Sequence, residues 1–113
     1  MAEARGGTRI SCKIQLILST LDNDPPLSGP CLVVLVNIRG CAARFNHPLK
    51  VGSAVRLEGL PTKPSVTARV VNCIQLGEYE KFWFLGLMLD EPGNVWGIAS
   101  PPEDWGITSS APA

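Results

Sequence analysis

Apolar and polar residues alternate along much of the chain with a period of two, which is typical of β-strands that bury one face. In Ile10 to Leu18, isoleucine, leucine and cysteine occupy every even position. A second alternation covers Ala54 to Leu60, whereas Cys31 to Val36 is a continuous apolar run. Such a run predicts a strand that is covered on both sides. No helical periodicity extends beyond two turns.

Proline, glycine and asparagine interrupt these segments about every ten residues, the spacing of a β-sandwich or β-barrel. The predicted connections are Asp22 to Pro30, Asn37 to Cys41, Pro61 to Pro64 and Gly77 to Glu80. The further predicted strands are Ala42 to Phe45, Val66 to Gln75 and Lys81 to Leu89. The pattern therefore predicts an all-β domain of six or seven strands. Closure into a barrel is favoured because it removes exposed strand edges from a small sheet.

The length of 113 residues suits one domain with a single core. We expect a flexible N-terminal arm over residues 1–8, which are glycine-rich and charged, a barrel over residues 9–106, and a frayed tail over residues 107–113. Trp96 and Trp105 lie near the end of the barrel segment. They are expected to anchor it by burying their large rings.

Charge and hydropathy exclude several classes of partner. Ten basic and ten acidic residues give a net charge of zero, so no global field attracts DNA, RNA or an anionic membrane. No apolar run approaches the length of about 18 residues that a transmembrane helix needs, and no signal peptide is recognisable. We therefore expect a cytoplasmic protein that does not insert into a membrane.

Catalytic and metal-binding patterns are also missing from the sequence. The only histidine, His47, precedes a proline, and no phosphate-binding loop or nucleophile motif accompanies it. The four cysteines show no C-x-x-C spacing and are expected to behave as small apolar residues. We expect no enzyme activity, no catalytic residue, no cofactor and no metal.

Arg5 and Arg9, four residues apart before the first predicted strand, are the clearest candidates for ligand binding. Guanidinium groups bind phosphate through paired hydrogen bonds and stack on flat bases. A dinucleotide with two phosphates and two guanines offers both targets. The alternative is that the two arginines simply form a solvated basic arm.

The order of these motifs resembles that of a bacterial PilZ domain, as a divergent member of that family. The matching segments are the R-x-x-x-R pair at Arg5 and Arg9, Asn37 to Ala42 in place of [DN]-x-S-x-x-G, His47 to Gly59, and Gly93 to Trp105. The resemblance implies a small antiparallel barrel that binds the second messenger cyclic di-GMP. It implies that Arg5 and Arg9 clamp the ligand, that Asn37 hydrogen-bonds to it, and that the ordered arm presents a surface to a protein partner.

Two substitutions in the second motif predict weak binding. Arg39 stands where the family has serine, and Ala42 stands where it has glycine. The longer Arg39 crowds the site or adds a phosphate contact. If position 42 needs a left-handed backbone, alanine costs about 1 kcal/mol relative to glycine. The alternative function is a protein-interaction module that keeps the PilZ fold without binding nucleotide.

Overall fold

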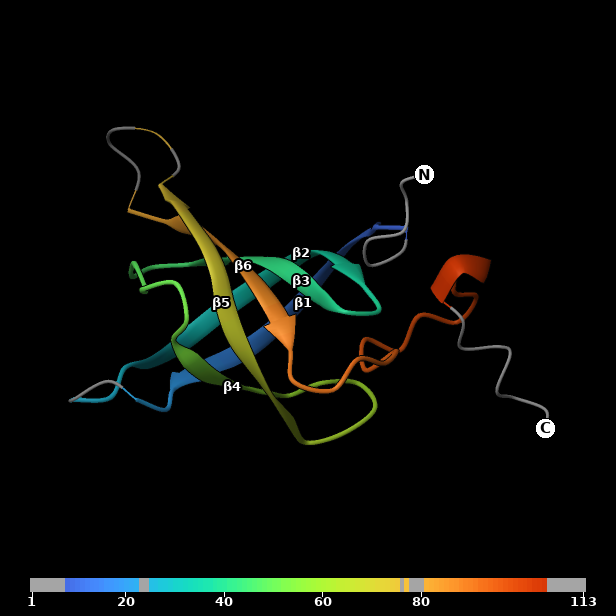
Figure 1. Ribbon diagram of the computed structural model, residues 1–113, viewed down its shortest axis with the longest axis horizontal. Helices are drawn as coiled ribbons and strands as arrows, with labels where there is room; N and C mark the ends of the chain where they lie inside the picture. Colours follow the sequence, from blue (N-terminus) through green and yellow to red (C-terminus); the bar gives the residue numbers. More distant parts are fainter. Residues whose placement is uncertain (1–7, 23–24, 76, 78–80, 106–113) are drawn as a thin grey trace.

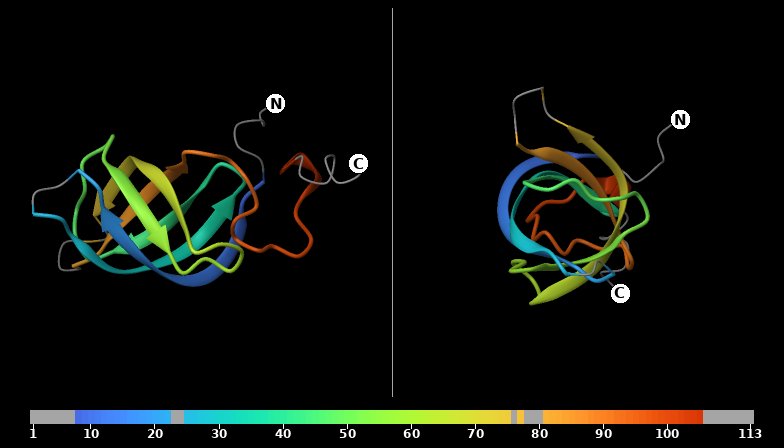
Figure 2. Two further views of the ribbon diagram at one scale, coloured as in Figure 1. Left: turned by 90° about the horizontal axis from the view of Figure 1, so that it is seen from below. Right: turned by 90° about the vertical axis from the view of Figure 1, so that its left-hand side faces the viewer.

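The computed structural model describes residues 8–22, 25–75, 77 and 81–105, and its architecture is a closed β-barrel. Six antiparallel strands follow one another around the barrel in the order β1-β2-β3-β6-β5-β4 (Figures 1 and 2). They are β1 (Ile10–Thr20), β2 (Ser28–Asn37), β3 (Gly40–Phe45), β4 (Ala54–Glu58), β5 (Ser65–Gln75) and β6 (Trp83–Leu89). Pairing of β1 with β4 closes the sheet. The predicted all-β antiparallel barrel is confirmed.

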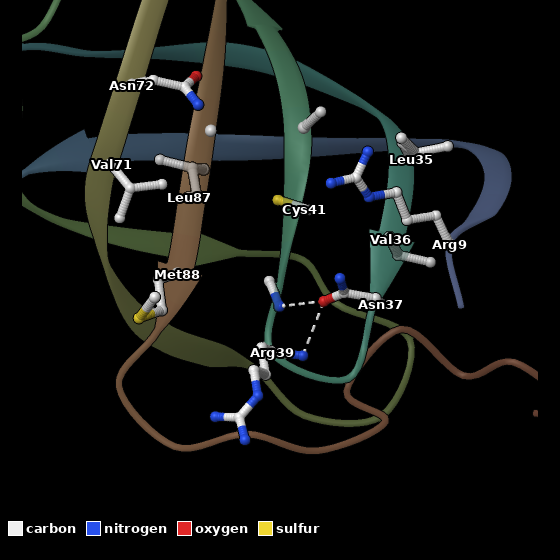
Figure 3. Close-up of a pocket in the computed structure, with 13 residues that line it drawn as sticks. Arg9, Leu35, Val36, Asn37, Arg39, Cys41, Val71, Asn72, Leu87 and Met88 are labelled. Carbon is white, nitrogen blue, oxygen red and sulfur yellow. Dashed lines mark hydrogen bonds between the residues drawn. The ribbon is translucent and has the colours of Figure 1, made fainter. Parts of the chain in front are cut away.

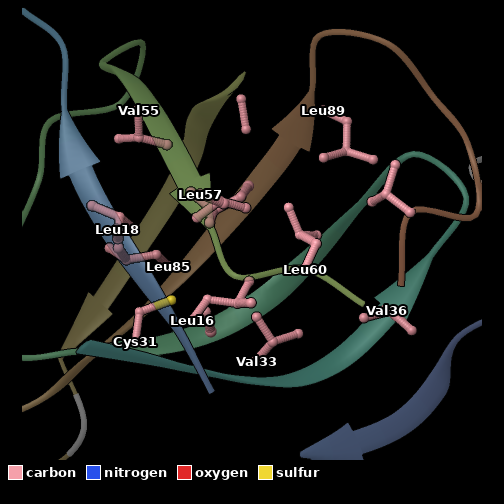
Figure 4. Close-up of a cluster of buried hydrophobic side chains, with 14 of the residues drawn as sticks. Leu16, Leu18, Cys31, Val33, Val36, Val55, Leu57, Leu60, Leu85 and Leu89 are labelled. Carbon is pink, nitrogen blue, oxygen red and sulfur yellow. The ribbon is translucent and has the colours of Figure 1, made fainter. Parts of the chain in front are cut away.

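The barrel interior is filled by apolar residues from all six strands. In β1 and β4 the period-two pattern predicted which residues these are. Figure 4 shows aliphatic side chains of β1, β2, β4 and β6 meeting in this core, to which all six strands contribute. Leu18, Val33, Val55, Leu57 and Leu85 are each 0% exposed. Burying one such side chain contributes about 1.5–3 kcal/mol, so this cluster is the main source of stability.

The predicted loop from Asp22 to Pro30 is wrong at its end, because β2 begins at Ser28 and includes Gly29 and Pro30. Pro30 pairs with Ile17 of β1, but pairing of β2 with β3 starts only at Leu32. Pro30 therefore lies where β2 has a partner on one side only. A proline is tolerated there because its missing N–H can face the unpaired side.

The predicted break from Asn37 to Cys41 is also too long. Only Ile38 and Arg39 form the turn, and Gly40 and Cys41 already belong to β3. Strands β2 and β3 are therefore joined by a tight turn, which brings the residues of the second motif onto one surface. Strands β1, β3, β4, β5 and β6 otherwise match their predicted bounds to within two residues.

After β6, the C-terminal segment runs beyond one end of the barrel and finishes in a short 3₁₀ helix, Glu103–Trp105 (Figure 1). Trp96 and Trp105 are 2% and 3% exposed. Their predicted role as anchors is confirmed. Across the described ranges, no helix is long and apolar enough to cross a membrane.

Candidate functional site

Four of the five predicted ligand-binding residues line one hollow of about 270 Å³ on the barrel surface. Arg9 lies at one side of it, Asn37 and Arg39 lie at the β2–β3 turn, and Ala42 lies in β3 (Figure 3). The fifth, Arg5, lies outside the described residues. The hollow spans β2, β3, β6 and β5, so it is built from segments far apart in the sequence.

Part of the hollow is lined by small residues where β3 and β6 pair. Ala42 pairs with Gly86, and Gly40 pairs with Met88. A Cβ atom added to Gly40 would lie 1.9 Å from the backbone oxygen of Leu87. Gly40 therefore permits the two strands to approach closely.

The turn beside the hollow is closed by the side chain of Asn37. Its Oδ1 atom accepts hydrogen bonds from the backbone N–H groups of Arg39 at 2.8 Å and Gly40 at 2.9 Å. Asparagine commonly stabilises turns in this way. Because this oxygen already accepts two hydrogen bonds, the group of the Asn37 side chain that is left for further hydrogen bonds is its amide NH₂, a donor.

Position 42 does not need a left-handed backbone. Among the described residues, positive φ values occur only at glycines. Ala42 instead lies in regular strand, paired with Leu35 and Gly86. The expected backbone penalty is therefore absent, and the methyl group affects binding only through the space that it occupies.

A further wall of the hollow comes from β5 and β6 and was not predicted from the sequence. It includes Val71 and Asn72 of β5 and Gly86, Leu87 and Met88 of β6. The register of β5 against β6 shifts between Val70 and Asn72, which marks a bulge. Val71 follows the buried Val70, points outward as the alternation of a strand requires, and is 43% exposed. The shift leaves Asn72 exposed as well, where regular alternation would turn it inward. No local sequence signal shows such a shift.

The charges around the hollow are all positive. Arg9 and Arg39 line it, whereas none of the described residues that line it is an aspartate or glutamate. The neutral net charge of the chain therefore conceals a local surface that favours an anion. Val71 and Met88, which are 43% and 50% exposed, add apolar surface beside these charges.

Both sides of the hollow are attached to the C-terminal segment. The indole N–H of Trp96 donates to the backbone oxygen of Asn37 at 2.9 Å. The indole N–H of Trp105 donates to the backbone oxygen of Thr8, next to Arg9, at 2.7 Å. The sequence predicts only that these tryptophans bury surface and that Thr8 belongs to the N-terminal arm, so neither hydrogen bond was predictable from it.

Cys31 and Cys41 are poorly suited to nucleophilic chemistry. Burial raises the pKa of the Cys31 thiol to about 12. Burial also raises the pKa of Cys41 well above its usual value, and the neighbouring Cys31 and Cys12 add to that shift. A thiol with a raised pKa carries little of the reactive thiolate near neutral pH. Within the described ranges, no three metal-ligating side chains are grouped to hold an ion.

No protein-family model, curated protein or solved structure matches this chain. The resemblance to PilZ domains therefore depends on the motif residues themselves. What the structure adds is the common hollow beside which Arg9, Asn37, Arg39 and Ala42 lie.

Proposed function

We propose that this domain is a weak receptor for cyclic di-GMP that acts by binding and not by catalysis. The supporting observation is the convergence of Arg9, Asn37 and Arg39 on one hollow without an acidic lining residue. Arg9 precedes Asn37 by 28 positions and Arg39 by 30, yet the barrel brings all three to the same surface. The ligand would order the N-terminal arm and so offer a new surface to a protein partner.

The chemistry of the lining residues suits a guanine dinucleotide. A guanidinium group binds a phosphate through two parallel hydrogen bonds, and it also stacks on a base. The amide nitrogen of Asn37 can donate to a phosphate oxygen or to the O6 and N7 acceptors of guanine. The apolar surfaces of Val71 and Met88 could contact the face of a base.

The same geometry explains why the affinity is expected to be low. Arg39 is exposed, so a ligand contact must restrain a long and flexible side chain. The Ala42 methyl group occupies space on the floor of the hollow, where the family has glycine. A combined loss of about 1.4 kcal/mol weakens binding tenfold.

Isothermal titration calorimetry with cyclic di-GMP tests this proposal. Arg9→Ala should weaken binding about tenfold or more, because a hydrogen bond to a charged group is worth roughly 1.5–3 kcal/mol. Lys13→Ala is the matched control, since Lys13 is an exposed cation of β1 outside the hollow. Equal losses in both variants, or no saturable heat with about 100 μM ligand, would refute the proposal.

A second candidate function is a protein-interaction module that does not bind nucleotide. It is favoured by the exposed apolar side chains of β5, β6 and the residue before β6, namely Val71, Ile74, Phe82 and Met88. A photocrosslinker at position 74 would test it in cells. A crosslinked partner that is retained in Arg9→Ala supports this function, whereas loss of the crosslink in that variant supports the nucleotide receptor.

A further inference from the structure

Arg9 lies at the hollow although it is not part of the barrel sheet. Strand β1 begins at Ile10, so neither Thr8 nor Arg9 is fixed by strand pairing. A long arginine on an unpaired segment loses considerable conformational entropy when it binds a ligand. Its contribution therefore depends on what holds the backbone beside it.

Three hydrogen bonds hold Thr8 to two consecutive residues at the other end of the chain. The backbone N–H and the hydroxyl of Thr8 donate to the two carboxylate oxygens of Asp104, at 3.2 and 2.8 Å. The backbone oxygen of Thr8 accepts the indole N–H of Trp105 at 2.7 Å. Each polar group of Thr8 is thus bonded to the 3₁₀ helix Glu103–Trp105.

The 3₁₀ helix is itself well fixed. The Trp105 side chain is 3% exposed and belongs to the core cluster. Further back in the same segment, Trp96 is hydrogen-bonded to Asn37, and the N–H of Gly93 donates to the backbone oxygen of Ile38 at 2.8 Å. One segment therefore holds both the β2–β3 turn and the residue before Arg9.

We infer that Asp104 and Trp105 are positioning residues of the ligand site, which hold the backbone at Thr8 so that Arg9 stays at the hollow. The inference rests on the proposed function for its ligand, cyclic di-GMP. The C-terminal segment thereby reduces the entropy that Arg9 loses on binding. Neither residue touches the hollow, so both act through Arg9.

A double-mutant cycle separates this role from general support of the fold. Trp105→Phe removes the indole donor but keeps an aromatic ring, and it should weaken cyclic di-GMP binding about fivefold to tenfold. In the Arg9→Ala background, Trp105→Phe should not weaken binding further, because the arginine side chain through which Trp105 acts is absent. Trp83→Phe is the control, since the half-buried Trp83 lies outside the hollow.

A second readout needs no ligand. The heteronuclear ¹⁵N NOE of the Arg9 amide should fall in Asp104→Ala and remain unchanged in Glu103→Ala, which removes the neighbouring exposed carboxylate. An unchanged Arg9 NOE in Asp104→Ala would overturn the inference, as would equal affinity losses from Trp105→Phe with and without Arg9. If the wild type gives no heat with cyclic di-GMP, the proposed function fails. The NOE of the Arg9 amide in Asp104→Ala then tests by itself whether the C-terminal segment holds Arg9 in place.

Discussion

Replacing Gly40 with alanine should strongly destabilise the barrel beside the hollow. The added Cβ atom would lie 1.9 Å from the backbone oxygen of Leu87 and 3.1 Å from the Cα atom of Met88. The first distance is more than 1 Å shorter than real Cβ atoms tolerate, and both obstacles are backbone atoms. No change of side-chain rotamer can therefore relieve the clash, and β3 must move away from β6.

The size of the effect follows from the ladder that this movement disrupts. Two neighbouring hydrogen bonds between β3 and β6 are weakened, each worth about 1 kcal/mol, and overpacking typically adds 1–3 kcal/mol. We therefore expect Gly40→Ala to lower the free energy of unfolding by about 3 kcal/mol. That is a large share of the roughly 5–15 kcal/mol available to a typical domain.

Two other glycines provide graded controls in urea unfolding followed by circular dichroism. A Cβ atom on Gly86 would meet the end of the Asn72 side chain at 2.7 Å, and that side chain is exposed and can turn away. A Cβ atom on Gly93 would meet nothing within 4 Å. The expected order of destabilisation is Gly40→Ala, then Gly86→Ala, then Gly93→Ala. A Gly40→Ala protein within about 1 kcal/mol of wild type would refute the reasoning.

Three further predictions concern the core and the hollow. Trp96→Phe leaves the backbone oxygen of Asn37 without its indole donor, so it should lower the free energy of unfolding in urea by about 1–3 kcal/mol. The loss should be clearly larger than that of Trp83→Phe, and equal losses would contradict a stabilising role for this hydrogen bond. The raised pKa of Cys31 stabilises the fold fully below its usual value of 9.0, and this contribution is lost as the pH rises towards about 12. Between about pH 9 and pH 12, the free energy of unfolding should therefore fall more steeply with pH in the wild type than in Cys31→Ala, by up to about 1.4 kcal/mol per pH unit. Equal slopes in the two proteins would disprove this contribution of Cys31. Ala42→Leu should fill the hollow and weaken cyclic di-GMP binding at least about tenfold in calorimetry with little loss of stability, whereas unchanged affinity would place the ligand elsewhere.

The fold was largely predictable because the period-two pattern directly reports which residues face the core. Leu16 and Leu18 lie on the predicted buried face of β1 and are 1% and 0% exposed. The pattern fails where local composition conflicts with pairing, as at Pro30. In a sequence, a proline predicts a loop. In the structure, it is compatible with a strand that has only one neighbouring strand at that point.

The candidate site was only partly predictable because its geometry depends on contacts distant in sequence. Asn37 and Arg39 belong to one short motif, so their proximity follows from the turn. Asn72 lies beside Val71 at the hollow because of a bulge, and the residue types in β5 do not reveal that bulge. The bond between Trp105 and Thr8 joins residues 97 positions apart, and nothing in either local sequence predicts it.

The most direct test of the central claim is a titration of ¹⁵N-labelled protein with cyclic di-GMP, followed by NMR. The proposed site predicts that amide shifts concentrate at Arg9, Arg39, Ala42 and Asn72, around the hollow. Amides near Lys63, a residue outside the lining, should stay unchanged. Shifts that avoid the hollow, or an unchanged spectrum at about 1 mM ligand, would contradict the claim that this surface is a cyclic di-GMP site.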